Sequence, residues 1–185
     1  MALKVGQKAP DFKVADQDGN QVSLSGFKGK KVILYFYPKD QTPGCTAEAC
    51  NLRDNYRGLQ RKGYEVIGVS TDTEKSHQKF IEKQNLPFRL LADVDKVAHA
   101  KYGTWVEKSM YGRKYMGTAR VTFIIDEKGA IEKIIEKVDT KNHTEQILSP
   151  SGPEGPAKSS RTRKSPPKKK AAKKPSKKAA RKKAK

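Results

Sequence analysis

Cysteine is scarce in this sequence, and long apolar runs are missing from it. Two cysteines among 185 residues are too few for the disulfide framework of a small secreted domain. No stretch approaches the roughly 20 apolar residues that a membrane-spanning helix needs, and the first residues lack the apolar run of a secretory signal. We therefore expect a soluble, cytoplasmic protein, because in reducing compartments a cysteine pair is more often catalytic, redox-sensing or metal-binding than structural.

Acidic residues are too few to balance the basic ones. The chain has 40 Lys and Arg against 20 Asp and Glu, a formal net charge of +20. Residues 151–185 hold fifteen of the basic residues and a single acid. We expect an ordered domain at 1–148, a Pro/Gly/Ser linker at 149–160, and a disordered Lys/Ala/Pro-rich basic tail at 161–185, which has no large apolar side chains to bury.

Strand and helix signals alternate through the first 148 residues. Apolar runs at 31–38 and 64–71 have the pattern of strands buried on both faces. The remaining signals are two short strands around an Asp-Gly turn at 11–24, a short strand at 88–91, a hairpin at 118–138, and helices at 43–61, 74–85, 95–103 and 143–148. This order predicts an α/β domain with a central mixed sheet flanked by helices.

Both cysteines lie in "PKDQTPGCTAEAC", where a strand gives way to a helix. If the helix begins near Pro43, Cys45 lies in its first turn, where free N–H groups and the helix dipole favour the thiolate. Cys45 is then a candidate nucleophile, and the alternative is a small buried hydrophobe. Thr42 can place a hydroxyl beside the sulfur, and Pro38 can fix the loop and shield the sulfur from water.

Cys50 lies five residues beyond Cys45. On a regular helix this spacing separates the Cα atoms by roughly 8.6 Å, which exceeds the limit of about 7 Å for a disulfide. If the two cysteines pair, the helix has to unwind locally first. The alternative is that Cys50 is a core residue that never meets Cys45.

An attacking sulfur also needs a fixed positive group nearby. Arg120 stands at the start of an apolar strand, where a charge is out of place unless it has a role, although an ordinary surface arginine is an equal alternative. Glu48, one turn after Cys45, can orient such an arginine or stabilise the helix start.

Other redox and metal sites find little support in the sequence. The three histidines, His77, His99 and His143, are scattered without ligand spacing, so we expect no zinc site. We interpret His77 and His143 as solvated helix residues and His99 as a residue on a helix face. The Cys-x-x-Cys pattern of thioredoxin-type oxidoreductases is absent.

The stretch "PKDQTPGC" fits the Pro-x-x-x-Thr-x-x-Cys signature and therefore resembles the peroxiredoxins. The following "TAEAC" places a cysteine where the peroxiredoxin Q (bacterioferritin comigratory protein) branch has its resolving cysteine. The segments "GQKAPDF", "YEVIGVSTDTEKSHQKF" and "GTARVTFIIDEKG" are similar to further parts of that family, so the resemblance covers about residues 3–148. Ala119 and Val121, which flank Arg120, and the basic tail depart from the family pattern.

The resemblance implies a thioredoxin-like fold and thiol-dependent reduction of hydrogen peroxide and organic hydroperoxides. Cys45 would be the peroxidatic cysteine, and Cys50 would resolve its sulfenic acid through an intramolecular disulfide. Thr42 and Arg120 would activate the peroxide and stabilise the thiolate, with Pro38 shielding the site and Glu48 in support. Thioredoxin or a similar dithiol would recycle the enzyme. The family needs no bound cofactor or metal, and members of this branch are often monomers.

The tail resembles, in composition, the tails of linker histones and of histone-like bacterial proteins. We expect it to bind DNA without sequence preference and with a steep salt dependence. The residues that would carry this contact are Lys168, Lys169, Lys170, Lys173, Lys174, Lys177, Lys178, Arg181, Lys182 and Lys183. Such contact implies association with the nucleoid in a bacterium or a nuclear location in a eukaryote.

Other interpretations of the tail stay open. It can direct nuclear import, attract anionic membranes without an apolar anchor, or only solubilise the protein. The whole chain also has a second interpretation as a redox-sensing nucleic-acid-binding protein with little peroxidase turnover.

Overall fold

The computed structural model describes residues 3–110 and 112–149, so the predicted tail and nearly all of the predicted linker lie outside the described residues. Within them, no helix is both long and apolar enough to cross a bilayer. The elements in chain order are β1 (Lys13–Ala15), β2 (Gln21–Ser23), the 3₁₀ helix η1 (Leu24–Phe27), β3 (Lys31–Phe36), α1 (Pro43–Asp54), α2 (Tyr56–Arg61), β4 (Tyr64–Ser70), α3 (Glu74–Gln84), β5 (Arg89–Ala92), α4 (Val97–Tyr102), β6 (Trp105–Met110), β7 (Arg113–Thr118), β8 (Val121–Ile125), β9 (Ile131–Ile135) and α5 (His143–Leu148).

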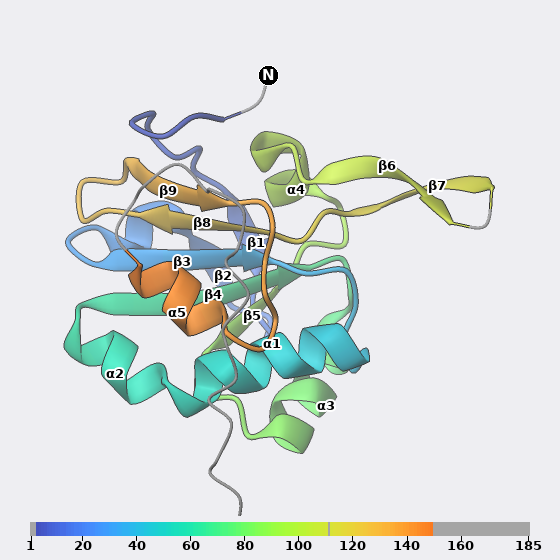
Figure 1. Ribbon diagram of the computed structural model, residues 1–185, viewed down its shortest axis with the longest axis horizontal. Coiled ribbons are helices and arrows are strands. Elements are labelled where there is room, and N and C mark those ends of the chain that lie inside the picture. The colour runs from blue at the N-terminus through green and yellow to red at the C-terminus, as the bar shows by residue number, and fades with distance from the viewer. Residues whose placement is uncertain (1–2, 111, 150–185) are drawn as a thin grey trace, which may run out of the picture. The chain divides into compact units, whose positions relative to one another are not determined.

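Five of these strands form one mixed sheet in the order β5-β4-β3-β8-β9 (Figure 1). The first three strands of this order are parallel, whereas β8 runs antiparallel to β3, and β9 runs antiparallel to β8. The predicted α/β class with a central mixed sheet is therefore confirmed. Within the described residues, β1-β2 and β6-β7 form two further two-stranded sheets.

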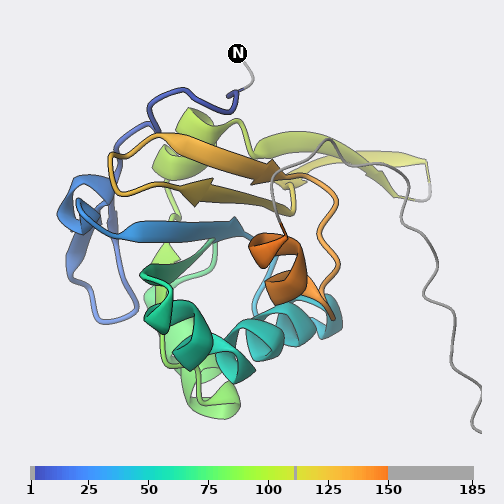
Figure 2. The ribbon, with the colours of Figure 1, turned by 60° about the vertical axis from the view of Figure 1, so that its left-hand side comes forward.

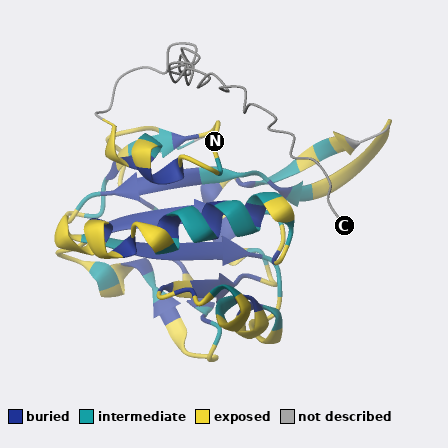
Figure 3. Ribbon diagram, turned by 60° about the horizontal axis from the view of Figure 1, so that its bottom comes forward, coloured by how far each residue is buried: buried dark blue, intermediate teal, exposed yellow. Residues whose placement is uncertain are grey.

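Both faces of the central sheet are covered. On β3, Val32, Leu34 and Phe36 face a core cluster built with β1, β2, η1 and α4. The alternate residues Ile33 and Tyr35, with Tyr37 beyond the strand, face a second cluster built with α1, α2, α3 and α5. Figure 2 shows α1, α2, α3 and α5 on one side of the sheet, and Figure 3 shows the buried strands beneath helices whose outer faces are exposed. Burial on both faces explains the continuous apolar run of β3.

Two local features differ from the sequence-based expectation. The single helix predicted at 43–61 is interrupted at Asn55, which separates α1 from α2. The hairpin of β6 and β7 was not predicted; it projects from the body of the domain in Figure 1. Residues 113–116 of β7 are exposed, the charged Arg113 and Lys114 as well as Tyr115 and Met116, so the strand lacks the apolar alternation by which strands are recognised in a sequence.

Gly68 on β4 makes room for the ring of Tyr35 on the neighbouring strand. The two residues are paired in the parallel register. A Cβ at position 68 would lie 2.7 Å from the Tyr35 hydroxyl oxygen and 2.6 Å from Cδ2 of Leu90. Because all of these atoms are packed in the core, the glycine is required by close approach rather than by a turn.

We predict that Gly68→Ala lowers the free energy of unfolding by about 1–3 kcal/mol, because the added methyl overpacks the core. Gly58→Ala is the matched control: position 58 lies within α2 with no atom within 4 Å of an added Cβ, so alanine should raise helix stability by up to about 1 kcal/mol. Urea unfolding of both variants measures the difference. Equal stabilities would show that the core around Tyr35 relaxes without penalty.

Candidate active site

The loop between β3 and α1 places Cys45 at the start of a helix. Thr42 is the N-cap of α1 with an extended backbone (φ −78°, ψ 150°), and Pro43 is the first helical residue, as expected from the sequence. Cys45 is therefore the third residue of the helix, and only 1% of its surface is exposed. The unpaired N–H groups and the positive dipole end of this first turn favour negative charge on the sulfur.

Arg120 contacts the same sulfur from the start of β8, the strand that pairs with β3 in the sheet. It directly precedes β8, and its Nη2 lies 3.3 Å from Sγ of Cys45. Its Nη1 donates to Oε2 of Glu48 on α1. Burial opposes the charge on this guanidinium, but the charges of Glu48 and Cys45 outweigh burial and raise the pKa of Arg120. The arginine thus stays cationic beside the sulfur, where an anionic nucleophile needs it.

Glu48 is fully buried, unlike an ordinary acid at a helix start. Burial raises its pKa to about 7, although the charge of Arg120 and its hydrogen bond act in the opposite direction. Of the two roles considered for Glu48, the contact that orients Arg120 is present. A carboxyl with a pKa near 7 changes its charge in the physiological range.

Thr42 and Pro38 lie in the loop that leads into α1. The Thr42 hydroxyl donates to the carbonyl of Lys39 at 3.0 Å, so its hydrogen is engaged while its lone pairs can accept a further hydrogen bond. Pro38 is half-buried just after β3. Its shielding of the Cys45 sulfur stays a prediction.

Cys50 lies on the same unbroken helix as Cys45, and the two thiols are separate. Its half-buried Sγ donates to Oε1 of Gln84 at the end of α3, over 3.5 Å. A disulfide between Cys45 and Cys50 would therefore require α1 to open, because their spacing on a helix exceeds the disulfide limit.

The residue after Cys50 joins α1 to the last helix. Asn51 accepts at Oδ1 from the backbone N–H and the hydroxyl of Thr144, both at 2.8 Å, and donates from Nδ2 to the carbonyl of Lys141 at 2.7 Å. Ile147 of α5 packs in the same cluster as Cys45 and Leu52. Helix α5 is thus docked on α1 directly beside Cys50.

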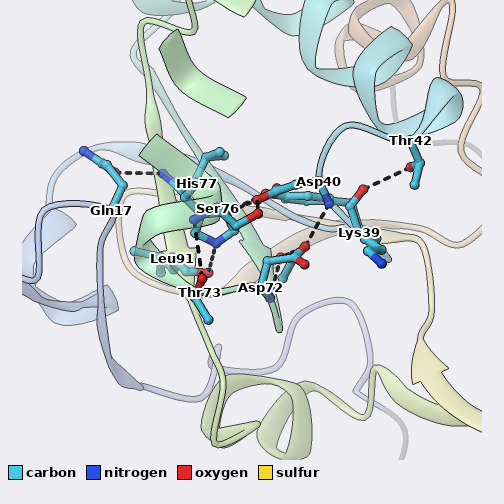
Figure 4. A network of polar contacts seen from close by, with 12 residues as sticks. Gln17, Lys39, Asp40, Thr42, Asp72, Thr73, Ser76, His77 and Leu91 are labelled. Atoms are coloured by element: carbon cyan, nitrogen blue, oxygen red, sulfur yellow. Dashed lines mark hydrogen bonds and ion pairs between the residues drawn. The ribbon is translucent and has the colours of Figure 1, made fainter. Parts of the chain in front are cut away.

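The sequence suggested that His77 is a solvated helix residue, but the side chain is fully buried. Its Nδ1 lies 2.9 Å from Oδ2 of Asp40, and its Nε2 lies 3.1 Å from the carbonyl of Leu91. Asp40 also accepts from the hydroxyls of Tyr37 and Ser76, each at 2.7 Å. Figure 4 shows that Asp40 lies between this cluster and the loop of Thr42, so α3 holds the loop that precedes Cys45.

Asp40 is kept ionised by these contacts. Burial alone would raise the pKa of Asp40, but the hydrogen bond and charge of His77, with further hydrogen bonds from Ser76 and Tyr37, hold it below its usual value. Its backbone N–H donates to Oδ2 of Asp72 at 2.8 Å. Asp72 directly precedes Thr73, whose hydroxyl caps α3, so this contact joins the loop to the start of α3.

His99 lies on α4, as a residue on a helix face should, and none of its surface is exposed. Its Nδ1 contacts Oδ2 of Asp93 at 2.5 Å, and its Nε2 contacts the hydroxyl of Thr118 at 2.9 Å. Thr118 ends β7, two residues before Arg120. This pair of contacts therefore anchors the strand end from which Arg120 projects.

His143, expected to be solvated, is the third buried histidine. It begins α5, and its Nε2 lies 3.0 Å from the hydroxyl of Thr122 on β8 and 3.7 Å from Oε1 of Glu48. All three histidines thus pack beside elements that hold active-site residues. Their role was missed because each contacts residues from separate segments of the chain, which leaves no local spacing signal.

Lys108 is a further residue that the sequence did not reveal. It lies half-buried on β6, and its Nζ donates to the carbonyl of Thr118 at 2.5 Å. Burial and the charge of Arg120 lower the pKa of Lys108, while Cys45 acts to raise it. The hairpin therefore brings a second cation into the electrostatic range of the sulfur. No group of three metal-ligating side chains was found among residues 3–149, position 111 aside.

We predict that Asp40→Asn lowers the free energy of unfolding at pH 7 by about 1–3 kcal/mol, because it breaks a buried, charge-assisted network. The pKa of Asp40 is lower in the folded protein, so its stabilisation is complete above the unfolded pKa near 3.9 and is lost as pH falls below it. The deficit of the variant should therefore shrink in acid. Chemical unfolding at several pH values checks this, with Asp54→Asn, whose side chain is 63% exposed, as control; a pH-independent deficit would contradict it.

The fold and the site together define a class of protein. A five-stranded mixed sheet that leads from its central strand into a helix, with a buried cysteine in the first turn of that helix and an arginine on its sulfur, is typical of thioredoxin-like thiol enzymes. Comparison with known proteins makes this assignment more specific.

Residues 5–134 match the model of the AhpC/TSA family. A putative peroxiredoxin bcp of Coxiella burnetii is 49% identical over 148 residues, which cover 80% of this chain and 98% of that relative. Peroxiredoxin Bcp of Bacillus subtilis is 45% identical, with 80% and 94% covered. A structure of Xanthomonas campestris peroxiredoxin Q superposes with a TM-score of 0.70 at 33% identity, covering 74% of this chain and 87% of that one. The chain therefore belongs to the AhpC/TSA family, in its Bcp/peroxiredoxin Q group, and is a thiol peroxidase.

Proposed function

We propose that the chain reduces hydrogen peroxide and organic hydroperoxides through Cys45 as the attacking thiolate and Cys50 as the resolving thiol. The observation that carries this assignment is the 3.3 Å contact between Nη2 of Arg120 and Sγ of Cys45 in the first turn of α1. A structure of the bacterioferritin comigratory protein of Xanthomonas campestris, 32% identical, is titled for its alkyl peroxide reduction activity, which supports organic hydroperoxides as substrates.

The first step oxidises the sulfur. The Cys45 thiolate attacks one oxygen of the peroxide, so that an S–O bond forms as the O–O bond breaks and the departing oxygen leaves as water or an alcohol once it takes a proton. Arg120 stabilises the charge that develops on the oxygens, and the lone pairs of Thr42 can accept from the peroxide hydroxyl. The product is the sulfenic acid of Cys45.

The next steps convert the sulfenic acid to a disulfide and then restore the two thiols. Helix α1 opens, the Cys50 thiolate attacks the Cys45 sulfur, and the hydroxyl of the sulfenic acid leaves as water. The resulting disulfide is reduced by an external dithiol, for which thioredoxin or a similar protein is suited, by thiol–disulfide exchange. No bound cofactor takes part, and the enzyme acts as a monomer in the cytoplasm.

We predict that Cys45→Ser abolishes peroxide turnover with a dithiol reductant, because the nucleophile is lost. Cys50→Ser should consume about one equivalent of peroxide and then stop as the Cys45 sulfenic acid. Stopped-flow peroxide consumption and mass spectrometry of the oxidised protein measure both outcomes, and in the unaltered chain the disulfide should map to Cys45 and Cys50. Full turnover by Cys45→Ser would remove Cys45 from the mechanism.

We also propose that the C-terminal tail binds DNA without sequence preference. Residues 151–185 carry fifteen Lys and Arg and one acid, and neutralising phosphates with such a chain releases counterions. The curated relatives are covered almost to their full length while the match spans 80% of this chain, so the tail is an addition to the shared domain. In a bacterium this contact would place the peroxidase at the nucleoid.

We predict that removing residues 150–185 abolishes DNA binding and leaves peroxide turnover unchanged, because the described active site lies wholly before them. Gel shifts of the full and shortened chains at two salt concentrations measure this, and binding by the full chain should fall steeply with salt. Equal binding by both chains would remove the tail from the interaction. A full chain that is oxidised once without turnover, and whose DNA affinity then changes, would favour a redox sensor over an enzyme.

A further inference from the structure

The active-site network leaves one buried oxygen without a partner. Oε2 of Glu48 accepts from Arg120, but Oε1 has no hydrogen-bond donor among the described residues. The atom that approaches it is Nε2 of His143, at 3.7 Å, and both side chains are fully buried. A buried carboxylate oxygen without a donor is unfavourable, so the position of the hydrogens on His143 decides how this pair behaves.

Gln146 determines where His143 carries its hydrogen. The amide of Gln146 accepts at Oε1 from the N–H of Asp139 at 2.7 Å and donates from Nε2 to the carbonyl of Lys137 at 3.0 Å. These two contacts orient the amide, and its oxygen lies 3.4 Å from Nδ1 of His143. Nδ1 therefore holds the hydrogen, and Nε2 presents a lone pair, to which the hydroxyl of Thr122 donates.

Two acceptors consequently face each other at the centre of the site. An ionised Oε1 of Glu48 would meet the lone pair of Nε2 with no hydrogen between them, whereas a protonated Oε1 carries no negative charge and can share the Nε2 lone pair with the Thr122 hydroxyl. Burial lowers the pKa of His143 to about 4, so the ring does not take this proton at neutral pH. Burial also raises the pKa of Glu48 to about 7, which agrees with a proton held by the carboxyl group and not by the ring.

We propose that His143 is a positioning residue for the reaction at Cys45: its acceptor nitrogen favours the neutral form of Glu48, so that the charge of Arg120 acts on the sulfur. An ionised Glu48 would compete with the thiolate for the same guanidinium and would place a second negative charge near it. The inference rests on the proposed role of Cys45 as the attacking residue.

The other charges around the pair are not altered by changing residue 143. Glu48 faces Arg120 directly and acts electrostatically on Tyr35. His143 experiences Arg120 and Lys133, which lower its pKa, and Asp139, which raises it. Substitution at position 143 therefore changes the hydrogen bonding to Glu48 and leaves these neighbouring charges in place.

The test is a ¹³C NMR titration of the Glu48 carboxyl in the reduced full-length protein, assigned by loss of its signal in Glu48→Gln. The unaltered protein should titrate near pH 7, and His143→Gln should titrate about one pH unit lower or more, because the amide NH₂ donates where histidine accepted. Tyr102→Phe is the control, since Tyr102 is also buried and the variant loses one hydrogen bond, to the carbonyl of Pro10, in the core cluster that does not contain Cys45. The control should leave the Glu48 midpoint in place, and equal midpoints in His143→Gln and the unaltered protein would overturn the proposal.

Thr122→Val should shift the Glu48 midpoint in the opposite direction to His143→Gln. Removing the hydroxyl frees the Nε2 lone pair for Glu48, so the carboxyl midpoint should rise. This variant decides the question if His143→Gln fails to fold, and an unchanged or lower midpoint would then sink the idea. Because the titration uses no peroxide, it succeeds or fails independently of the proposed role of Cys45.

The consequence for reactivity is measured in the Cys50→Ser background, where only the first oxidation occurs. His143→Gln should slow oxidation of Cys45 at pH 7 by about fivefold, because an ionised Glu48 competes with the sulfur and the peroxide for the Arg120 guanidinium. The difference in oxidation rate between His143→Gln and its Cys50→Ser parent should become smaller at pH values below the lowered midpoint of Glu48, where the carboxyl is neutral in both proteins. A deficit that is the same at every pH would indicate a structural role only and would contradict the positioning role.

Discussion

A half-buried guanidinium needs partners that accept its hydrogen bonds, and much of the arrangement around the active site follows from that constraint. Arg120 is drawn to the first turn of α1 by the Cys45 sulfur and by Glu48, which is itself fully buried. Moving the strand or the helix alone would separate the guanidinium from both partners and would leave the buried Glu48 oxygen without its donor. The contact that suits the sulfur for attack thus also fixes β8 against α1.

The three buried histidines extend this fixation to the segments that carry the site. Each one joins elements distant in sequence: His77 joins α3 to the loop of Asp40, His99 joins α4 to the end of β7, and His143 joins α5 to β8. Loops alone would leave Cys45 and Arg120 free to change their relative positions, because loops have few buried contacts. Buried polar contacts of this kind favour one geometry over its neighbours, since any displacement leaves a polar atom without a partner.

The sequence predicted the parts of the site that depend on local order. Pro43 before Cys45 indicated a helix start, and the apolar run before Pro38 indicated the buried strand that leads into it, both as found. The charge of Arg120 was conspicuous because it stands beside apolar residues. His77 and His143 were interpreted wrongly because a histidine on a polar helix gives no sign of its partners: Asp40 lies 37 residues from His77, and Thr122 lies 21 residues from His143. The β6–β7 hairpin was not predicted for a related reason: its exposed strands bury little apolar surface.

The proposed mechanism sets two opposing requirements for helix α1, and both involve the segment around Asn51. Attack on peroxide needs an intact first turn, whereas a disulfide to Cys50 would need the helix to open. Oxidation of Cys45 replaces an anionic sulfur by a neutral sulfenic acid, which weakens the hold of Arg120 at the moment when opening becomes useful. Opening at Cys50 would also pull on Asn51, which holds Thr144 of α5. Since α5 also carries His143, release of this contact would remove the acceptor from Glu48, so the same motion that serves resolution dismantles the arrangement that serves attack.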